Sequence, residues 1–475
     1  MAGDEASEAL APDEALENAW NALDHSPLDK GAKRAVVRLL REHPGLARPQ
    51  RQGAIEALLR DPDVDPQHVS AAGWSLLQAD GRLAPDGDPR AIATALERDG
   101  VAQSLLEEAC VSRLDAERTL TGLRRWLLLS GEWPSHPRLT RALETQARLN
   151  GGAWPFEEDE REKLEQTSPA FASAYRPLRA SEAATPRFGD PVTQSVADQY
   201  ARWPYPTWSR LSAPEETTLP RAIEKLDGGQ ECGLPVAAEV LVAGCGTGRE
   251  AAQLARRFPD AHVTAIDISA ASLDYAAQRC AGLGIDFRLL DLHDARQLGR
   301  EFDLVACSGV LHHLSDPEAG WARLADVLAP GGVMKIMLYS RVGRLGIEAA
   351  KRRIADLREL PVDDDLLRAV RRRLIAEAPD FVAGFYDFYS LAGVHDLLLN
   401  RHEDPFDVPR IGRALDRLGL ELLAFKLPTA AEKARYLKDH PGDPLLRDRE
   451  GWAQIEATRP FIFSAMYEFW CRKPA

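Results

Sequence analysis

The stretch EVLVAGCGTG at residues 239–248 decides the fold, together with VTAIDIS at residues 263–269. The first begins as a continuous apolar run, which predicts a strand buried on both faces. It then breaks into three alternate glycines directly before a helical pattern. Glycine suits such a turn because the backbone adopts φ values that a Cβ disfavours and a ligand lies against the main chain. We therefore predict a strand, a tight glycine turn and a helix.

Asp267 ends the second stretch and follows Gly248 by 19 positions. That is about the ~20-residue spacing at which an acidic side chain reaches both ribose hydroxyls of a bound nucleoside. The turn reads Gly244-x-Gly246-x-Gly248, so its last glycine comes one position earlier than in the dinucleotide fingerprint. This spacing favours a nucleoside without a pyrophosphate. A glycine turn that binds nothing is the plain structural alternative.

Two further strand-like segments follow in order. Residues 285–292 end near Asp291, whose carboxylate can accept from an adenine amino group, and residues 302–314 run into a small-residue turn with Ser308. Taken together, these pieces resemble the class I S-adenosylmethionine-dependent methyltransferases, and residues 328–340 are similar to the family's fifth strand. The resemblance implies an α/β fold with a doubly wound, seven-stranded Rossmann-like sheet. It also implies S-adenosyl-L-methionine as the cofactor.

The resemblance assigns parts of this cofactor to individual residues. The glycines would lie against its methionine and ribose portion, Asp267 would hold the ribose hydroxyls, and Asp291 with Leu292 would hold the adenine. Ser308 would lie near the methionine portion. The expected cofactor-binding residues of the sheet are Gly244, Gly246, Gly248, Asp267, Asp291, Leu292 and Ser308.

Composition limits the class of protein. The chain has 475 residues, 45% hydrophobic and 28% charged, which is typical of a globular protein with two or three domains. A net charge of −14 disfavours nucleic acid as a partner, because phosphates require a basic face. The sequence shows no signal-peptide pattern, no apolar run of ~20 residues and no Cys-x-x-Cys pair. We expect a cytoplasmic protein without a membrane partner or a metal.

Residues 15–180 show helical spacing almost throughout, with Pro- and Gly-bearing breaks. This pattern predicts a helical domain at 1–180, either a structural cap or a degenerate tetratricopeptide-like array that offers a concave surface to a protein partner. A linker and aromatic cofactor lid would follow at 181–210. The methyltransferase domain would occupy 211–475, with a helical lid insertion at 343–419. This order resembles bacterial methyltransferases joined to a tetratricopeptide-like region.

The segment QSVADQYARWPYPTW at residues 194–208 is rich in aromatic residues, and we call it the aromatic segment. Two prolines flank Tyr205 and predict an extended chain, because proline restricts its own φ and the residue before it. By the family resemblance, Tyr200, Trp203 and Tyr205 close over the cofactor, where an aromatic face and a sulfonium gain about 0.5–2 kcal/mol. Alternatively, these rings dock the helical domain on the catalytic domain.

Methyl transfer needs alignment of nucleophile, carbon and sulfur, and a hydroxyl or ammonium acceptor must also lose a proton. Histidine has a pKa suited to that task. His312 and His313 follow the fourth strand and Tyr339 ends the fifth, so we expect these three as catalytic candidates. The alternative for the histidines is packing in the helix that follows. Weaker candidates in the insertion are Asp387, Tyr389, His395 and His402.

Two functional hypotheses follow. The first is a methyltransferase that modifies a small metabolite or a peptide or protein side chain, with the helical domain selecting the partner. The second is a non-catalytic cofactor-binding scaffold or protein-interaction module that keeps the pocket but transfers nothing.

Overall fold

The computed structural model describes residues 11–83, 87–174, 186–427, 429–459, 462–463 and 466–475. Part of the predicted linker, residues 181–185, lies outside this range. Helices alone form the first part of the chain, which we call the helical region. Its α-helices are α1 (Pro12–His25), α2 (Lys30–Glu42), α3 (Gln52–Arg60), α4 (Gln67–Ala79), α5 (Pro89–Arg98), α6 (Gly100–Glu108), α7 (Leu114–Leu129), α8 (Pro137–Leu149), α9 (Glu158–Thr167) and α10 (Pro169–Ala174).

A seven-stranded sheet forms the second part, in the order β3-β2-β1-β4-β5-β7-β6. The strands are β1 (Glu239–Ala243), β2 (His262–Asp267), β3 (Asp286–Leu289), β4 (Phe302–Ser308), β5 (Leu328–Tyr339), β6 (Glu421–Lys426) and β7 (Met466–Arg472). β1 to β5 pair in parallel, whereas β7 is antiparallel to both β5 and β6. The predicted doubly wound sheet is therefore confirmed. Its strand order reverses at β1 and β4, and ligands of open α/β sheets bind at such a point.

Each face of the sheet is covered by its own core, which explains the continuous apolar run in β1. Val240 and Val242 pack in one cluster, and Leu241 and Ala243 pack in the other. The first cluster includes residues of α12 (Leu219–Leu226), α13 (Arg249–Arg257) and α14 (Ala270–Arg279). The second includes residues of α15 (Pro317–Asp326), α21 (Val408–Leu418), α22 (Ala430–Asp439) and α23 (Arg449–Thr458).

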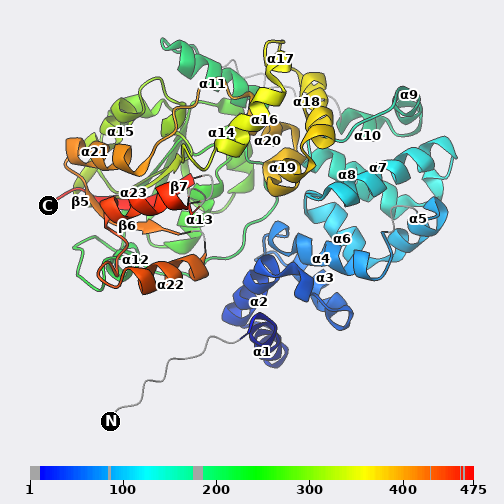
Figure 1. The fold of residues 1–475 in the computed structure, drawn as a ribbon, viewed down its shortest axis with the longest axis horizontal. Helices are drawn as coiled ribbons and strands as arrows, with labels where there is room; N and C mark the ends of the chain where they lie inside the picture. Colours follow the sequence, from blue (N-terminus) through cyan, green and yellow to red (C-terminus); the bar gives the residue numbers. More distant parts are fainter. Residues whose placement is uncertain (1–10, 84–86, 175–185, 428, 460–461, 464–465) are drawn as a thin grey trace.

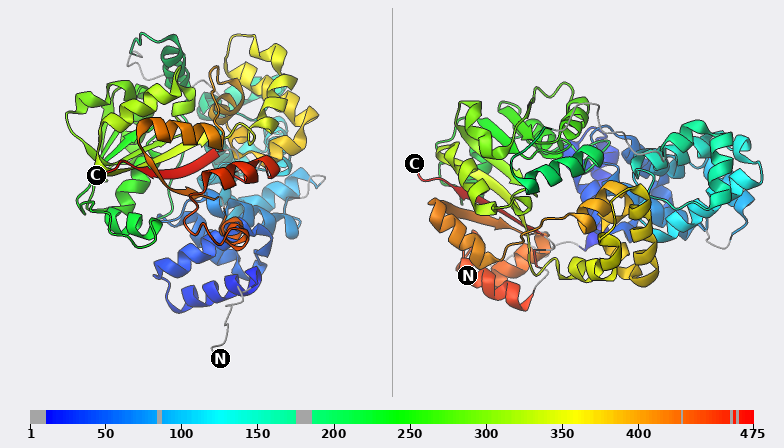
Figure 2. Two further views of the ribbon diagram at one scale, coloured as in Figure 1. Left: turned by 60° about the vertical axis from the view of Figure 1, so that its left-hand side comes forward. Right: turned by 90° about the horizontal axis from the view of Figure 1, so that it is seen from above.

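A helical insertion between β5 and β6 lies beside the helical region, as Figures 1 and 2 show in yellow and cyan. It shares one apolar core with that region, because Cys110 and Ala153 pack in the same cluster as Val370 and Phe388. Its elements are α16 (Leu345–Arg353), α17 (Ala355–Arg358), α18 (Asp364–Glu377), α19 (Pro379–Gly384), η6 (Tyr386–Tyr389), α20 (Leu391–Val394) and the π-helix η7 (His395–Leu399).

The aromatic segment is only partly extended, which corrects the prediction. Helix α11 (Pro191–Arg202) occupies its first half. Asp190 caps this helix by accepting from the Thr193 N–H at 2.9 Å, and proline stands at its first position, which is a strong start signal. The chain becomes extended only from Trp203 onward, where the two prolines act.

In the described part of the chain, no helix combines the length and the apolar character that spanning a bilayer requires.

A buried ion pair joins the insertion to the helical region. Arg371 on α18 is 1% exposed, and its Nη1 and Nη2 donate to the two carboxylate oxygens of Glu117 on α7 at 3.0 and 2.8 Å. The same guanidinium donates to the carbonyls of Ala153 at 2.7 Å and Phe388 at 2.9 Å. This contact therefore fixes η6, which contains Phe388, against the helical region.

Replacing Arg371 with methionine leaves the Glu117 carboxylate buried without its cation. Losing one partner of a buried pair costs about 3–5 kcal/mol, so we expect a clearly lower urea-unfolding midpoint and faster proteolysis of the insertion. Arg372→Met, at the exposed neighbouring position, is the matched control. Equal urea-unfolding midpoints for the two variants would contradict the stabilising role of the ion pair between Arg371 and Glu117.

Candidate functional site

A cavity of about 500 Å³ opens where the parallel strands end. Residues of the glycine turn, of β2, β4 and β5, of α11 and of the insertion line it. Its size lies within the ~300–1,000 Å³ typical of small-molecule sites. The cavity is therefore placed at the switch point that the strand order defines.

Two glycines of the turn bring the backbone to the cavity. Gly244 has a φ of +70°, and a Cβ there would lie 2.4 Å from Cγ2 of Val310. Gly246 has a φ of +51°, and a Cβ there would lie 3.1 Å from the carbonyl oxygen of Tyr205. Both glycines line the cavity, so neither tolerates a side chain and both expose main chain to a ligand.

Gly248 differs in position from the other two glycines of the turn. It does not line the cavity; it begins α13 with a φ of +80°. A Cβ there would lie 2.7 Å from Cβ of Ala276 on α14. This glycine therefore lets α13 pack closely on α14, and its predicted contact with the cofactor stays a prediction.

Asp267 at the end of β2 braces the glycine turn. Its Oδ2 accepts from the Gly246 N–H at 2.7 Å, and its Oδ1 accepts from the Ser269 N–H at 2.8 Å. Burial raises the pKa of Asp267. Asp267 lines the cavity, and both of its oxygens already accept from backbone N–H groups. Its contact with two ribose hydroxyls, which the spacing predicts, stays a prediction.

Asp291 and Leu292 line the same cavity beside β3. Asp291 Oδ1 accepts from the His293 N–H at 2.9 Å and contacts His293 Nδ1 at 2.8 Å. Burial opposes the charge of Asp291, but the His293 contacts outweigh it and lower the pKa of this carboxyl. Both contacts use Oδ1, so Oδ2 is available to accept from an amino group.

Ser308 leads to a charged cluster at the floor of the cavity that the sequence analysis missed. Its hydroxyl donates to Oε1 of Glu250 at 2.9 Å, and Lys335 Nζ donates to the same oxygen at 2.6 Å. Burial opposes the charge of Lys335, but Glu250 and Glu468 outweigh it and raise its pKa. Lysine in the middle of the apolar strand β5 was the available signal.

The helical region contacts a residue that lines this cavity. Asp65, which follows α3, contacts Nη2 of Arg249 through Oδ2 at 2.9 Å, and Arg249 lines the cavity. About two turns further along α13, Arg256 donates to Asp63 at 2.8 Å. The first helices and the glycine turn are therefore held together beside the site.

The aromatic segment bonds to the glycine turn and to the insertion. Trp208 Nε1 donates to the Thr247 carbonyl at 3.0 Å. The Tyr200 hydroxyl donates to Oδ1 of Asp396 at 2.6 Å, and the Tyr205 hydroxyl donates to Asp387. Both tyrosines and both carboxylates line the cavity. These tyrosines are therefore where a lid over the cavity requires them.

Trp203 does not line the cavity, and its predicted role in closing over the cofactor stays a prediction. Its ring stacks on His395 at 4.6 Å between centroids, and its Nε1 donates to Asp364 at 3.0 Å. These two contacts join the end of α11 to the insertion. His395 and Tyr389 likewise serve packing and line no part of the cavity.

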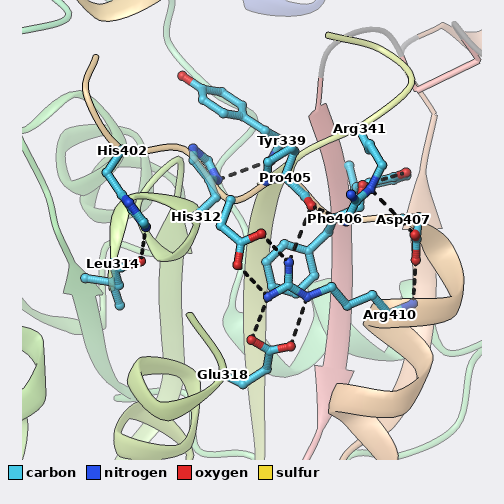
Figure 3. A network of polar contacts seen from close by, with 12 residues as sticks. His312, Leu314, Glu318, Tyr339, Arg341, His402, Pro405, Phe406, Asp407 and Arg410 are labelled. Atoms are coloured by element: carbon cyan, nitrogen blue, oxygen red, sulfur yellow. Dashed lines mark hydrogen bonds and ion pairs between the residues drawn. The ribbon is translucent and has the colours of Figure 1, made fainter. Parts of the chain in front are cut away.

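The two adjacent histidines after β4 lie in different surroundings. His312 is fully buried and does not line the cavity; its Nδ1 accepts from the Tyr339 N–H at 3.2 Å (Figure 3). Burial lowers the pKa of His312 well below its usual value. A neutral ring bonded to the backbone of β5 fits a structural role, and the predicted catalytic role of His312 stays a prediction.

His313 and Tyr339 both line the cavity. His313 Nδ1 lies 2.9 Å from the carbonyl oxygen of His402, so Nδ1 carries the proton and Nε2 is the acceptor. Burial lowers the pKa of His313 to about 4, which leaves it neutral at pH 7. The Tyr339 hydroxyl lies 3.5 Å from Oδ2 of Asp396, and burial raises the pKa of Tyr339.

His402 donates from Nε2 to the Leu314 carbonyl at 2.8 Å (Figure 3).

Asp387 and Asp396 are the acidic groups that the insertion adds to the cavity. Burial raises the pKa of both, and that of Asp396 reaches about 6. Asp387 had been only a weak candidate and Asp396 had no assigned role. Their tyrosine partners come from a segment far away in the sequence, so spacing alone could not reveal them.

The strand order, the glycine turn and the acidic ends of β2 and β3 define a nucleoside-binding α/β domain. Residues 240–332 match the family model described as a methyltransferase domain. The chain therefore carries a class I S-adenosylmethionine-dependent methyltransferase domain, which confirms the resemblance seen in the sequence. S-adenosylmethionine is the cofactor that this family implies.

Several known proteins are similar to this chain. An uncharacterised protein of Synechococcus sp. is 41% identical over 225 residues, which cover 45% of this chain and 50% of that protein. Trans-aconitate 2-methyltransferase of Deinococcus radiodurans is 40% identical over 102 residues, 21% of this chain and 38% of that enzyme. The solved structure of PKMT2 from Rickettsia typhi with AdoHcy aligns at 16% identity and a TM-score of 0.40. The alignment covers 56% of this chain and 54% of the PKMT2 chain. The chain spans half the length or less of these two sequence relatives.

The raised pKa of Asp396 gives a stability prediction. Its folded value of about 6 lies above the ordinary 3.8, so the folded state loses stability as pH rises between these values. Asp396→Asn removes the group whose titration causes this loss. Between pH 4.5 and pH 7.5, the free energy of unfolding of the variant should therefore rise by on the order of 1–3 kcal/mol relative to that of the native chain. Urea-unfolding midpoints at the two pH values measure it, with the exposed Asp380→Asn as control. A gain that does not depend on pH would contradict the assignment.

Proposed function

We propose that this protein transfers a methyl group from S-adenosylmethionine to a nucleophile on a small metabolite or on a peptide or protein side chain. The observation that carries the proposal is the pairing of Gly246 with Asp267 inside a cavity of about 500 Å³. The turn supplies bare backbone, and the carboxylate supplies acceptors for two sugar hydroxyls. These features fit the nucleoside portion of the cofactor.

The remaining residues fit the rest of the cofactor in chemical type. Asp291 offers an acceptor to an adenine amino group, and Leu292 offers an apolar surface. Ser308, Glu250 and Arg249 offer hydroxyl, carboxylate and guanidinium groups to an amino-acid portion. When bound, the cofactor supplies a methyl carbon activated by a positive sulfur. The chain then has to orient the acceptor, exclude water and accept a proton.

We further propose that the helical region shapes this site as well as contacting a partner. Asp65 of that region contacts the cavity residue Arg249, and Glu117 holds the insertion through Arg371. Both contacts support a role of the helical region in positioning the cofactor and the substrate.

Asp267→Asn should weaken binding of S-adenosylmethionine and of its demethylated product by roughly 10- to 100-fold. The amide loses one acceptor and opposes an N–H donor, and a hydrogen bond to a charged group contributes about 1.5–3 kcal/mol. Isothermal titration calorimetry measures the effect, and Asp260→Asn on the exposed turn after α13 is the control. Unchanged affinity in a folded Asp267 variant would refute the assigned site.

Incubation of the pure protein with methyl-labelled cofactor and an extract of its source cells tests the transfer itself. We expect label in the low-mass or the protein fraction, and loss of that label in the Asp267 variant. Tight cofactor binding without any label transfer would refute the enzymatic proposal and favour the scaffold.

A further inference from the structure

The part of the cavity formed by the insertion carries more negative than positive charge. Asp387 and Asp396 both line it, and each accepts hydrogen bonds from tyrosine hydroxyls. Within the described residues, neither carboxylate forms an ion pair with lysine, arginine or histidine. Tyrosine hydroxyls satisfy lone pairs but bring no positive charge. The buried carboxylate of Asp396 and the half-buried carboxylate of Asp387 therefore face the cavity without a cation of their own.

The nearby cations are already matched by other carboxylates. Arg344 Nη2 donates to Oε1 of Glu403 at 2.6 Å, and Lys351 Nζ donates to Oε2 of the same residue at 2.6 Å. Lys351 also contacts Glu348 at 2.9 Å. Two cations and two anions thus balance each other beside the cavity. The guanidinium of Arg344 lies 3.7 Å from the centre of the Tyr339 ring, and Arg344 lines the cavity as a cation already paired with Glu403.

At the opposite end of the cavity the two cations are likewise matched by carboxylates, and Asp267 and Asp291 also line that end. Lys335 is bonded to Glu250 at 2.6 Å, and Arg249 to Asp65 at 2.9 Å. His313, with its proton on Nδ1, adds no positive charge at neutral pH. The excess charge of the insertion end is therefore negative, and a carboxylate acceptor would meet like charge there.

On the basis of the proposed function, we infer that the methyl acceptor is an amine that enters the insertion end as its ammonium ion. Asp387 and Asp396 provide the counter-charge, and the rings of Tyr200, Tyr205 and Tyr339 provide the aromatic walls that attract a cation. Asp396 is the group placed to take the ammonium proton, because two tyrosine hydroxyls hold its carboxylate in position. This assigns a substrate class to the site.

The transfer balances with these residues. Asp396 accepts one proton from the ammonium, which frees the lone pair on nitrogen. That lone pair forms the new nitrogen–carbon bond while the methyl carbon–sulfur bond breaks and its electron pair stays on sulfur. The product amine keeps one positive charge, and Asp396 releases its proton to water. No oxidant, reductant or metal takes part.

The protonation of Asp396 depends on several neighbouring titratable and charged groups. Tyr200 on α11, Tyr339 on β5, Arg344, Asp387 and Glu403 all act on it. The carboxylate is the competent form of the base, so the transfer rate should rise with pH as the Asp396 proton is lost and then level off. Asp396→Asn should lower the rate at least ~100-fold and remove that rise.

The product of labelled-methyl transfer tests the acceptor class. The extract that has received labelled methyl groups from the cofactor is treated with mild base. The position of the label is then identified by mass spectrometry of the hydrolysate. Label that stays on nitrogen supports the inference. Label released as methanol from an ester, or found on oxygen, carbon or sulfur, overturns it. Absence of all label refutes the proposed function instead, so the two failures are distinguishable.

A binding measurement tests the charge of the site without turnover. Sinefungin carries a primary amine in place of the S-methyl group, so it presents an ammonium on the acceptor side. Calorimetry should show that Asp396→Asn and Asp387→Asn each reduce the preference for sinefungin over S-adenosylhomocysteine by about 10-fold. Asp380→Asn, exposed on the same insertion, should leave it unchanged. An unaltered preference in both site variants, with unfolding midpoints showing intact folds, overturns the inference.

Discussion

The hydrogen bond from the Gly246 N–H to Asp267 is the contact on which the site depends. It joins the turn after β1 to the end of β2, while the second oxygen of the same carboxylate accepts from the N–H of Ser269, the residue that caps α14. One buried side chain thereby fixes the two loops between which a nucleoside would lie. Because Gly246 also lies against the Tyr205 carbonyl, the aromatic segment is fixed relative to the same turn. The strand order determines where the cavity lies in the sheet, and the hydrogen bond between Gly246 and Asp267 fixes the conformation of the loops around it.

The other half of the cavity is not built by the sheet. Asp387 and Asp396 reach it from the insertion, and Arg371 holds that insertion through the Phe388 carbonyl, the residue next to Asp387. Close backbone packing adds to this constraint, because a Cβ on Gly393 would lie 2.1 Å from the Asp387 carbonyl oxygen. The acidic groups are therefore positioned by contacts with the helical region. A methyltransferase sheet alone would lack this part of its site.

The sequence was sufficient for features that depend on local spacing. The apolar run of β1, the positive-φ glycines and Asp267 all follow from a strand, a turn and a strand, and each was predicted. Features that depend on distant packing were missed. Gly248 serves a helix contact with Ala276, and Trp203 docks on His395 some 190 positions later. The neighbours His312 and His313 look alike in the sequence, yet only the three-dimensional structure shows which one the turn after β4 buries completely.

Buried carboxylates explain why this architecture needs so many fixed contacts. Removing Asp387 and Asp396 from water disfavours their charged forms, and tyrosine hydroxyls compensate only part of that cost. A loosely held insertion would move to rehydrate them, so the free energy of docking has to exceed the gain from solvation. The Arg371–Glu117 pair, the shared apolar core and the stacked Trp203 supply that docking. A ligand with positive charge would relieve the same cost directly, which links the stability of the site to the charge of the molecule that it binds.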